Sequence, residues 1–183
     1  MRASRQLLLR LLDDGVIAAF DRGWRPPLKP QRAQDPHDWP HLRDLIVHAF
    51  SGMDGRIDPP SSAHHLTAVD IAAQAVDGEV WVIGAPAVAC VFLTPMSHAL
   101  YLGKLAVDPA VQRMGYGRRL IGLAELRAHE LALPALELWT RIELTENHAT
   151  FRALGFVQSG QSSHPGFDRP TTLIFTKRLG VAH

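Results

Sequence analysis

Apolar side chains recur with a helical period early in the chain. Within residues 39–50 they lie on one helical face, at spacings of three, one and three positions: Leu42, Leu45, Ile46 and Ala49. A loop rich in Gly, Pro, Asp and Ser follows, and Ser62 at its end is positioned to cap a second helix over residues 63–76. The pattern therefore predicts two helices, with a short strand near residues 31–34 before them.

From residue 79 the pattern of apolar residues becomes typical of strands. Residues 79–83, 87–94 and 99–107 are short apolar or β-branched runs that tight connections separate. Runs of this length and composition predict three consecutive strands, which short turns would pair in antiparallel fashion.

The C-terminal half alternates between the two periods. It predicts a helix over residues 118–131, a strand over 135–144, a helix capped by Thr145 and stopped at Gly155, and a final strand over 171–179. The element order predicts an α+β fold, a mixed α/β sandwich of helices on one sheet.

Composition narrows the class of protein. The chain has 183 residues, 46% hydrophobic and 20% charged, which suits one globular domain. The formal net charge of +1 gives no global reason to expect a nucleic acid partner, and no apolar run approaches the ~20 residues that span a bilayer. Cys90 is the single cysteine, so no internal disulfide forms; this suits a reducing compartment and predicts a cytoplasmic location.

Residues 1–27 are interpreted as a helical N-terminal extension. Arg10 interrupts their apolar block and two aspartates follow it, unlike a secretory signal peptide. The proline-rich stretch 25–30 indicates a linker. We therefore expect a single domain over residues 28–183. The extension is either a peripheral helix without a function of its own or a helix that docks on that domain or on a second subunit of a homodimer.

The stretch Gln112–Gly117 carries the clearest chemical signal. It lies between a predicted strand and a predicted helix, where free helix amides attract anions. Gly115 and Gly117 remove side chains from the approach of a phosphate group. Three arginines at this helix start, each disfavoured by ~0.3–1 kcal/mol, would be stabilised by an anionic ligand: Arg113, Arg118 and Arg119. The stretch matches neither the dinucleotide fingerprint nor the P-loop.

The pattern Gln112-x-x-Gly115-x-Gly117 resembles the Q/R-x-x-G-x-G/A signature of the GCN5-related N-acetyltransferases (GNAT). Residues 143–156 resemble the later strand–helix block of that family, and residues 32–50 its opening strand and helix. The resemblance covers about residues 28–178. It implies a central mixed, mostly antiparallel sheet flanked by helices, with acetyl-CoA as co-substrate.

The resemblance also implies where acetyl-CoA lies. Its pantetheine arm would run along the strand that ends at Val107, and an N–H near Leu105 or Ala106 would polarise the thioester carbonyl. The implied cofactor-binding residues are Leu105, Ala106, Val107, Gln112, Arg113, Met114, Gly115, Tyr116, Gly117, Arg118, Asn147 and Phe151.

One position departs from the family pattern. Many members carry Tyr where this chain has Phe151, and that phenol is taken as the acid that protonates the departing thiolate. Phe has no such proton. Tyr116 in the loop and Tyr101 early on its strand are not obvious substitutes.

Glu143 is the candidate base that takes the proton of the amine, because it ends the strand expected to flank the cleft. The alternative is an ordinary ion pair at a strand end. His164, in a loop that would border the acceptor, is a second candidate, and His148 is a weaker one because it is expected to be exposed. Three aspartates would either attract a cationic amine or simply form turns: Asp54, Asp58 and Asp168.

These observations predict an N-acetyltransferase that moves the acetyl group of acetyl-CoA to the amine of a small molecule, by direct attack in a ternary complex. Two alternatives stay open: a CoA-binding sensor or interaction module without catalysis, which Phe151 would suit, and an acetyltransferase acting on a protein amine. No nucleic acid, membrane or metal partner is expected, since His64 and His65 lack the companions of a metal motif.

Overall fold

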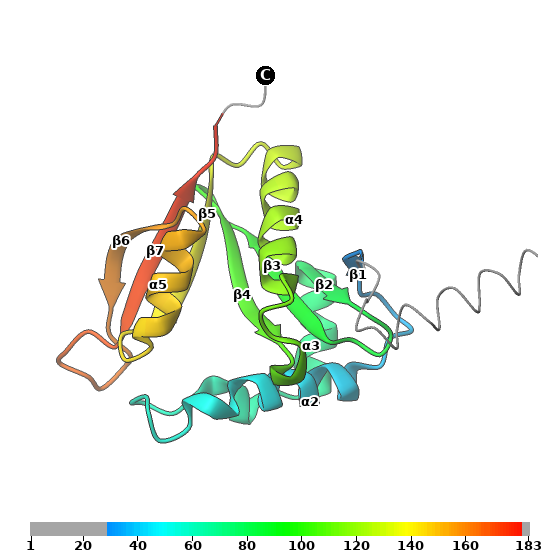
Figure 1. Ribbon diagram of the computed structural model, residues 1–183, viewed down its shortest axis with the longest axis horizontal. Coiled ribbons are helices and arrows are strands. Elements are labelled where there is room, and N and C mark those ends of the chain that lie inside the picture. Colours follow the sequence, from blue (N-terminus) through cyan, green and yellow to red (C-terminus); the bar gives the residue numbers. More distant parts are fainter. Residues whose placement is uncertain (1–28, 181–183) are drawn as a thin grey trace, which may run out of the picture.

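A seven-stranded sheet organises residues 29–180, the part of the chain that the computed structural model describes (Figure 1). In chain order the strands are β1 (Gln31–Arg32), β2 (Glu79–Ile83), β3 (Ala89–Pro95), β4 (Leu100–Val107), β5 (Ala135–Arg141), β6 (Val157–Ser162) and β7 (Thr172–Arg178). Their order across the sheet is β1-β2-β3-β4-β5-β7-β6. Every neighbouring pair is antiparallel except β4–β5, which is parallel. The predicted α+β class and mixed, mostly antiparallel sheet are confirmed.

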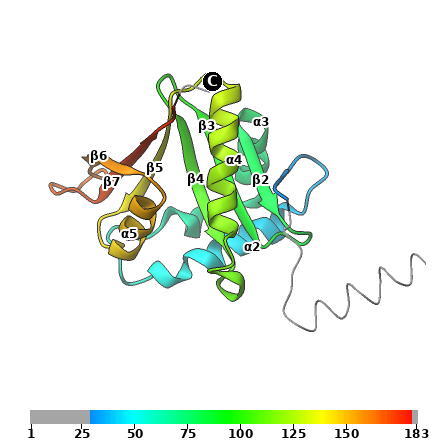
Figure 2. The same cartoon turned by 45° about the horizontal axis from the view of Figure 1, so that its top comes forward.

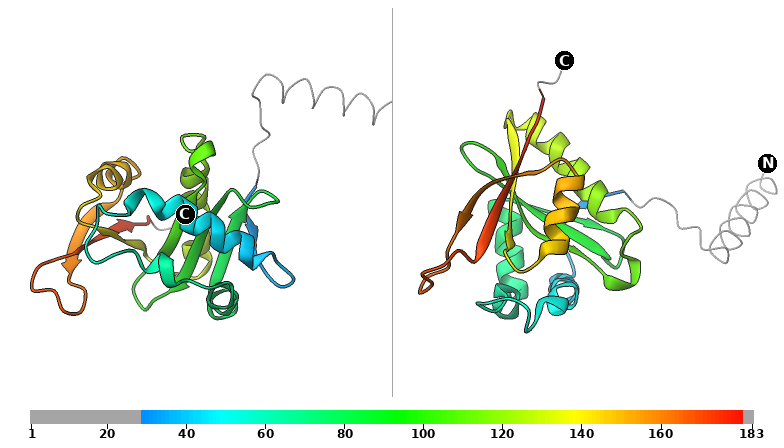
Figure 3. Two further views of the ribbon diagram at one scale, coloured as in Figure 1. Left: turned by 90° about the horizontal axis from the view of Figure 1, so that it is seen from below. Right: turned by 60° about the vertical axis from the view of Figure 1, so that its left-hand side comes forward.

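Helices cover both faces of the sheet (Figures 2 and 3). The helices are α2 (Trp39–Phe50), α3 (Ala68–Asp77), α4 (Tyr116–Glu130) and α5 (Thr145–Ala153), and short 3₁₀ turns are η1 (Ser51–Met53), η2 (Ser62–His65) and η3 (Pro109–Val111). Side chains alternate along the strands, so Val91 packs toward α4 while Cys90 and Phe92 pack toward α2 and α3. The helix and linker predicted for residues 1–30 fall almost wholly outside the described residues.

The helix predicted over residues 63–76 is two separate elements. Ser61, rather than Ser62, caps η2, because its side-chain oxygen accepts from the backbone N–H of Ala63 at 3.2 Å. Thr67 then starts α3 with a capping box, in which Thr67 and Asp70 each accept from the other's backbone N–H. The Thr-x-x-Asp spacing is the local signal for this second start.

Three further boundaries differ from the prediction. Helix α4 begins at Tyr116, two residues earlier than predicted, and β5 ends at Arg141 rather than at residue 144. Thr145 is the first helical residue of α5 and not its cap; Leu144 precedes it without a side-chain cap. Gly155 adopts φ +88° just after the helix, as its predicted stop requires.

Strand β6 is the one strand that the sequence reading missed. It is an edge strand that pairs only with β7 in the described sheet, and five of its six residues are exposed. An exposed edge strand buries no face, so its sequence, VQSGQS, lacks the apolar alternation that marks the other strands.

A partly buried ion pair joins α4 to the start of β2. Arg127 donates to both carboxylate oxygens of Glu79, at 3.0 and 2.6 Å, and Trp81 Nε1 donates to the same carboxylate at 2.8 Å. Burial alone would raise the pKa of Glu79, but the contacts with Arg127, Trp81 and Arg32 outweigh it and hold the pKa below its usual range. The pair therefore stabilises the fold while Glu79 is ionised.

We expect Arg127→Met to lower the free energy of unfolding at pH 7 by about 2–3 kcal/mol, somewhat less than for a fully buried pair. Because the folded pKa of Glu79 is lowered, its contribution is complete above the unfolded pKa of about 4.3 and fades as pH falls through the folded pKa. Urea unfolding at pH 7 and at pH below 4 measures both effects.

The matched control is Arg43→Met, which removes an exposed salt bridge to Asp44 and a long hydrogen bond, 3.4 Å, to the Leu66 carbonyl oxygen, and should cost no more than about 1 kcal/mol. Equal losses for the two variants, or a loss for Arg127→Met that grows on acidification, would contradict the assignment.

Candidate active site

Strands β4 and β5 pair at one end and then separate (Figure 1). Their parallel pairing joins Leu100–Leu102 to residues 136–138 and stops there. A β-bulge accompanies the separation: Lys104 and Leu105 both lie opposite Val91 of β3, and Lys104 has φ +47°. Within the described sheet, residues 103–107 therefore have no strand partner on their β5 side, and their backbone is available to a ligand.

The predicted glycine loop lies beside this opening. Asp108 caps η3 through its carboxylate, which accepts from Ala110 N–H at 2.8 Å, and the chain then turns into α4. Arg113 and Gly115 both have positive φ, +65° and +83°, and Gly115 is the N-cap of α4. Glycine suits this left-handed position, and it leaves the first helical amides without a side-chain cap.

The space around the loop suits a phosphate group. A Cβ added at Gly115 would meet no heavy atom within 4 Å, and one at Gly117 would meet only Val107 Cγ2, at 3.8 Å. The first turn of α4 contains no acidic residue, and Arg118 lies in it. The free amides and the positive end of the helix dipole thus face open space beside the end of β4.

The other predicted cofactor-binding residues take different positions. Met114 is exposed, whereas the ring of Tyr116 is buried in the core beneath α4, so only the Tyr116 backbone amide is available to a ligand. Ala106 is likewise buried, on the α2 side of the sheet. Gln112 Nε2 lies 3.5 Å from the carbonyl oxygen of Val107, which connects the loop to the strand end.

A cavity of about 330 Å³ opens between the separated strands, on the face that carries α2. Strand β4 contributes Tyr101–Leu105, β5 contributes Trp139–Arg141, and the segment after α2 contributes Met53, Ile57 and Ser62. Asn147 of α5 and His164 also line it, so the cavity reaches the predicted acceptor loop. A small molecule in this cavity would lie beside the unpaired stretch of β4.

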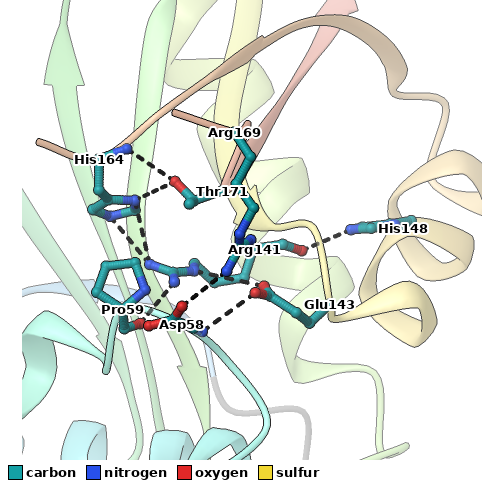
Figure 4. Close-up of polar contacts among 8 residues, drawn as sticks. All are labelled: Asp58, Pro59, Arg141, Glu143, His148, His164, Arg169 and Thr171. Atoms are coloured by element: carbon teal, nitrogen blue, oxygen red, sulfur yellow. Dashed lines mark hydrogen bonds and ion pairs between the residues drawn. The ribbon is translucent and has the colours of Figure 1, made fainter. Parts of the chain in front are cut away.

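Arg141 holds one wall of the cavity together (Figure 4). It donates to the carbonyl oxygen of Pro59 at 2.7 Å and reaches His164 Nε2 at 3.1 Å, while its Nε lies 3.9 Å from the carboxylate of Glu143. The neighbouring pair Arg169–Asp58, at 2.8 Å, ties the same loop to the β6–β7 connection. These contacts position residues 58–59 over the cavity.

His164 is brought into the site, as predicted. Its backbone N–H donates to Thr171 Oγ1 at 3.0 Å, and its Nδ1 lies 2.6 Å from the same oxygen. A guanidinium only donates, so Nε2 accepts from Arg141 and the proton of the neutral ring lies on Nδ1. Burial, and then the charge of Arg141, lower the pKa of His164. Its lone pair becomes available to an amine only if Arg141 moves.

Glu143 lies in the turn between β5 and α5, not at the strand end. One carboxylate oxygen accepts from the Asp58 backbone N–H at 3.3 Å; the other, buried, faces Arg141 without a hydrogen bond. Glu143 is not among the residues that line the cavity. Its predicted role as base stays a prediction, and a water molecule would have to connect it to the amine.

His148 was expected to be exposed, and this is wrong. The residue is buried, its Nε2 lies 2.9 Å from the Arg141 carbonyl oxygen, and its ring packs 5.7 Å from that of Phe175. The helix start at Thr145 makes it the fourth helical residue, on the side of α5 that faces the sheet. His148 thus supports the end of β5 from behind.

The sequence did not point to Lys104 or Trp139 as site residues, and Tyr101 was judged an unlikely substitute for the missing phenol. Lys104 lines the cavity at the bulge, and the Tyr101 and Trp139 rings meet edge to face at 5.5 Å across the two strands. The one local signal was the Gly-Lys pair inside an apolar strand. Of the aspartates that would attract an amine or form turns, Asp54 lies in a turn and pairs with His64 at 2.8 Å, and Asp58 lies in a bend and pairs as described above.

Within residues 29–180 no helix has the length and apolar character needed to cross a membrane, and no group of three or more His, Cys, Asp or Glu residues is placed to hold a metal ion. The burial of Cys90 raises the pKa of its thiol to about 12, so the thiol stays protonated and unreactive at neutral pH.

Comparison with known proteins gives a family match and similar folds. The model of the acetyltransferase (GNAT) family matches residues 39–156, more than half of the chain. No curated protein sequence shows a significant match.

Several solved structures share the fold. The PaiA N-acetyltransferase from Thermoplasma acidophilum, in complex with coenzyme A, is 11% identical with a TM-score of 0.72, over 84% of this chain and 100% of that one. A GNAT family acetyltransferase from Elizabethkingia anophelis with acetyl-CoA bound is 16% identical with a TM-score of 0.61, over 85% and 100%. The ribosomal-protein-S18-alanine N-acetyltransferase from Escherichia coli is 17% identical with a TM-score of 0.62, over 84% and 96%.

Proposed function

The chain belongs to the acetyltransferase (GNAT) family, as its glycine loop predicted, and from this premise we propose that it transfers an acetyl group from acetyl-CoA to the amine of a small molecule, with both bound in a ternary complex. The observation that carries the proposal is the separation of β4 and β5, with unpaired backbone and the glycine loop on one side and a cavity for the acceptor on the other.

The residues present fit acetyl-CoA. The free amides at the start of α4, with Arg113 and Arg118 close by in the chain, would hold the pyrophosphate. The unpaired edge of residues 103–107 would hydrogen-bond the pantetheine arm as an added strand does. Asn147, which lines the cavity, would contact the arm from α5.

Acetyl-CoA supplies an activated acetyl group, as a thioester. A backbone N–H near Leu105 or Ala106, beyond the bulge, would donate to the thioester carbonyl oxygen and stabilise the charge that develops there. The amine must lose a proton before or during attack, and Glu143, through water, or His164 would take it. The new N–C bond replaces the C–S bond, and the thiolate then needs a proton.

The proton donor for the thiolate is not Phe151. Its ring is partly buried and packs on Phe156 and Phe175, each at 6.1 Å between ring centroids. Tyr101 is a phenol in the cavity, and burial first and then Glu137 raise its pKa, which keeps it protonated. Tyr101 or water would supply the proton in this chain.

Replacing Phe151 with Tyr tests whether the missing phenol limits turnover. If it does, we expect kcat to rise by roughly tenfold or more, with the ~10²–10⁴-fold contribution of acid–base catalysis as the upper bound, and little change in KM for acetyl-CoA. Steady-state kinetics on an accepted amine gives the answer, and Phe156→Tyr is the control because Phe156 is fully buried. Unchanged kcat in a folded Phe151→Tyr protein would assign the proton to another group.

Two alternatives make different predictions. A CoA-binding sensor would bind acetyl-CoA but acetylate none of a broad panel of amines. An acetyltransferase for protein amines would acetylate peptides and leave small amines unmodified; the Escherichia coli relative, by its name, acts on an alanine of a ribosomal protein. The volume of about 330 Å³ favours a small acceptor. Calorimetric binding of acetyl-CoA, together with CoA release on small amines and on peptides, separates the three functions.

A further inference from the structure

Among residues 29–180, the acceptor cavity is lined by basic residues and by no acidic ones. Lys104, Arg141 and His164 line it, and no Asp or Glu is among its lining residues in the described part of the chain. A site for a polyamine, or for any acceptor recognised by positive charge alone, would require carboxylates here. The lining instead favours an acceptor with a negative group.

Two of the three basic residues already have partners. Arg141 lies beside Glu143 and donates to Pro59, and His164 is neutral and held by Arg141 and Thr171. Neither residue therefore leaves a positive charge without a partner. Lys104 is different.

The ammonium group of Lys104 has a hydroxyl partner but no carboxylate partner. Its Nζ donates to Ser62 Oγ at 3.2 Å, and no Asp or Glu among residues 29–180 comes within 4.0 Å of it to form an ion pair. Lys104 is partly buried, and this burial lowers its pKa. An anion bound beside Nζ would offset the cost of holding that charge away from water.

The location of Lys104 relates this charge to the reaction. It lies at the bulge of β4, directly before Leu105 and Ala106, whose backbone would contact the thioester. Its Nζ reaches Ser62, which lines the same cavity, so a negative group bound to Lys104 would share that cavity with the reacting amine, as the carboxylate of an α-amino acid does.

The remaining wall of the cavity is apolar. Phe50, Met53 and Ile57 come from α2 and the segment after it, and Leu144 comes from the turn after β5. A second cavity of about 360 Å³ adjoins at Tyr101, Gly103 and Lys104. Its one lining carboxylate, Asp77, forms no ion pair with Lys104.

We propose that Lys104, together with the Ser62 hydroxyl, binds the carboxylate of the acceptor, and that the acceptor is a small amino acid-like amine with an apolar side chain. This inference rests on the proposed function, because it concerns the acceptor of the same transfer. It distinguishes the acceptor from a polyamine and from a lysine side chain or N-terminus of a protein, which carry no carboxylate beside the amine.

The test compares each amino acid with its primary carboxamide, which lacks the negative charge of the carboxylate. L-Leucine, L-methionine and L-phenylalanine are assayed for CoA release beside their primary carboxamides, with spermidine as a polyamine. The carboxamide has the same shape and a less basic amine. More of that amine is neutral at pH 7, so without a carboxylate site the carboxamide should react faster. We expect the wild-type protein to prefer the amino acids by about 10- to 100-fold in kcat/KM, the effect of one charge-assisted hydrogen bond.

Lys104→Met should abolish that preference by lowering kcat/KM for the amino acids while leaving the carboxamides unchanged. Lys29→Met is the matched control, because Lys29 is exposed and lines neither cavity. Equal losses on both substrates would overturn the inference, because Lys104 would then not read the carboxylate. A wild-type preference for the carboxamides or for spermidine would overturn it too, while leaving the acetyltransferase function intact.

A binding measurement separates the two proposals if no amine is acetylated. Calorimetry of the same three amino acids against protein saturated with CoA should show binding that Lys104→Met weakens at least tenfold. Binding without turnover would mean that the proposed transfer fails and the carboxylate site stands. Absence of binding to the wild-type protein would overturn the carboxylate site.

Discussion

Replacing Glu143 with Gln is expected to slow acetyl transfer by about 10²–10⁴-fold, the range for a fully effective general base, while leaving acetyl-CoA binding unchanged. Gln keeps the shape of the side chain and can still accept from the Asp58 backbone N–H, so residues 58–59 should keep their position. The loss would come from the missing proton acceptor.

Glu143 also lies beside Arg141, so a lower rate alone would not establish a base. The pH profile separates the two roles. If Glu143 takes the proton through water, the wild-type rate rises with pH until both the base and the amine are deprotonated, and Glu143→Gln loses one of those limbs. If Glu143 only positions Arg141, the variant is slower but its rate depends on pH as in the wild-type protein. That result would exclude Glu143 as the base.

The matched control is Glu146→Gln, three residues farther along. Glu146 pairs with Arg56 at 2.5 Å on the exposed side of α5, and it lines neither cavity. We expect its replacement to leave the rate nearly unchanged, since Glu146 lies outside both cavities and its exposed pair contributes little to stability. His164→Gln completes the series. If His164 is the base, this variant, and not Glu143→Gln, should lose one limb of the pH profile.

Replacing Gly117 with Asp is expected to lower acetyl-CoA affinity by more than tenfold without unfolding the protein. The new carboxylate would lie at the second residue of α4, where it repels a pyrophosphate and competes for the helix amides. Losing one charge-assisted hydrogen bond, worth about 1.5–3 kcal/mol, corresponds to a factor of roughly 10–150.

The free energy of unfolding of Gly117→Asp should rise slightly while its affinity for acetyl-CoA falls. Acidic residues stabilise helix N-termini by about 0.3–1 kcal/mol, and a Cβ at Gly117 makes only an ordinary contact with Val107. Isothermal calorimetry with acetyl-CoA and thermal unfolding therefore give opposite signs if the loop binds the pyrophosphate. Gly122→Asp, two turns into the same helix with no heavy atom within 4 Å of an added Cβ, should leave affinity unchanged. Unchanged affinity in Gly117→Asp would place the pyrophosphate elsewhere.

The sequence by itself determined the features that depend on residues close together in the chain. The helical face of α2, the three antiparallel strands β2–β4 and the glycine loop before α4 were all readable, because each depends on side-chain period or on local backbone conformation. Gly115 shows this directly: its φ of +83° at the N-cap is a property that glycine provides at that one position. The family followed from the same loop and from the block around residues 143–156.

Only the tertiary structure decided what lies in the acceptor cavity. Lys104 looked like one polar residue in an apolar strand until the bulge and the separation of β4 from β5 placed it between two cavities. His148 is buried, and Glu143 lies behind Arg141 rather than at a strand end, because the end of β5, α5 and the loop around Asp58 pack together from distant parts of the chain. Such contacts have no local periodicity, so side-chain burial and pairing in the site emerge only when the sheet is assembled.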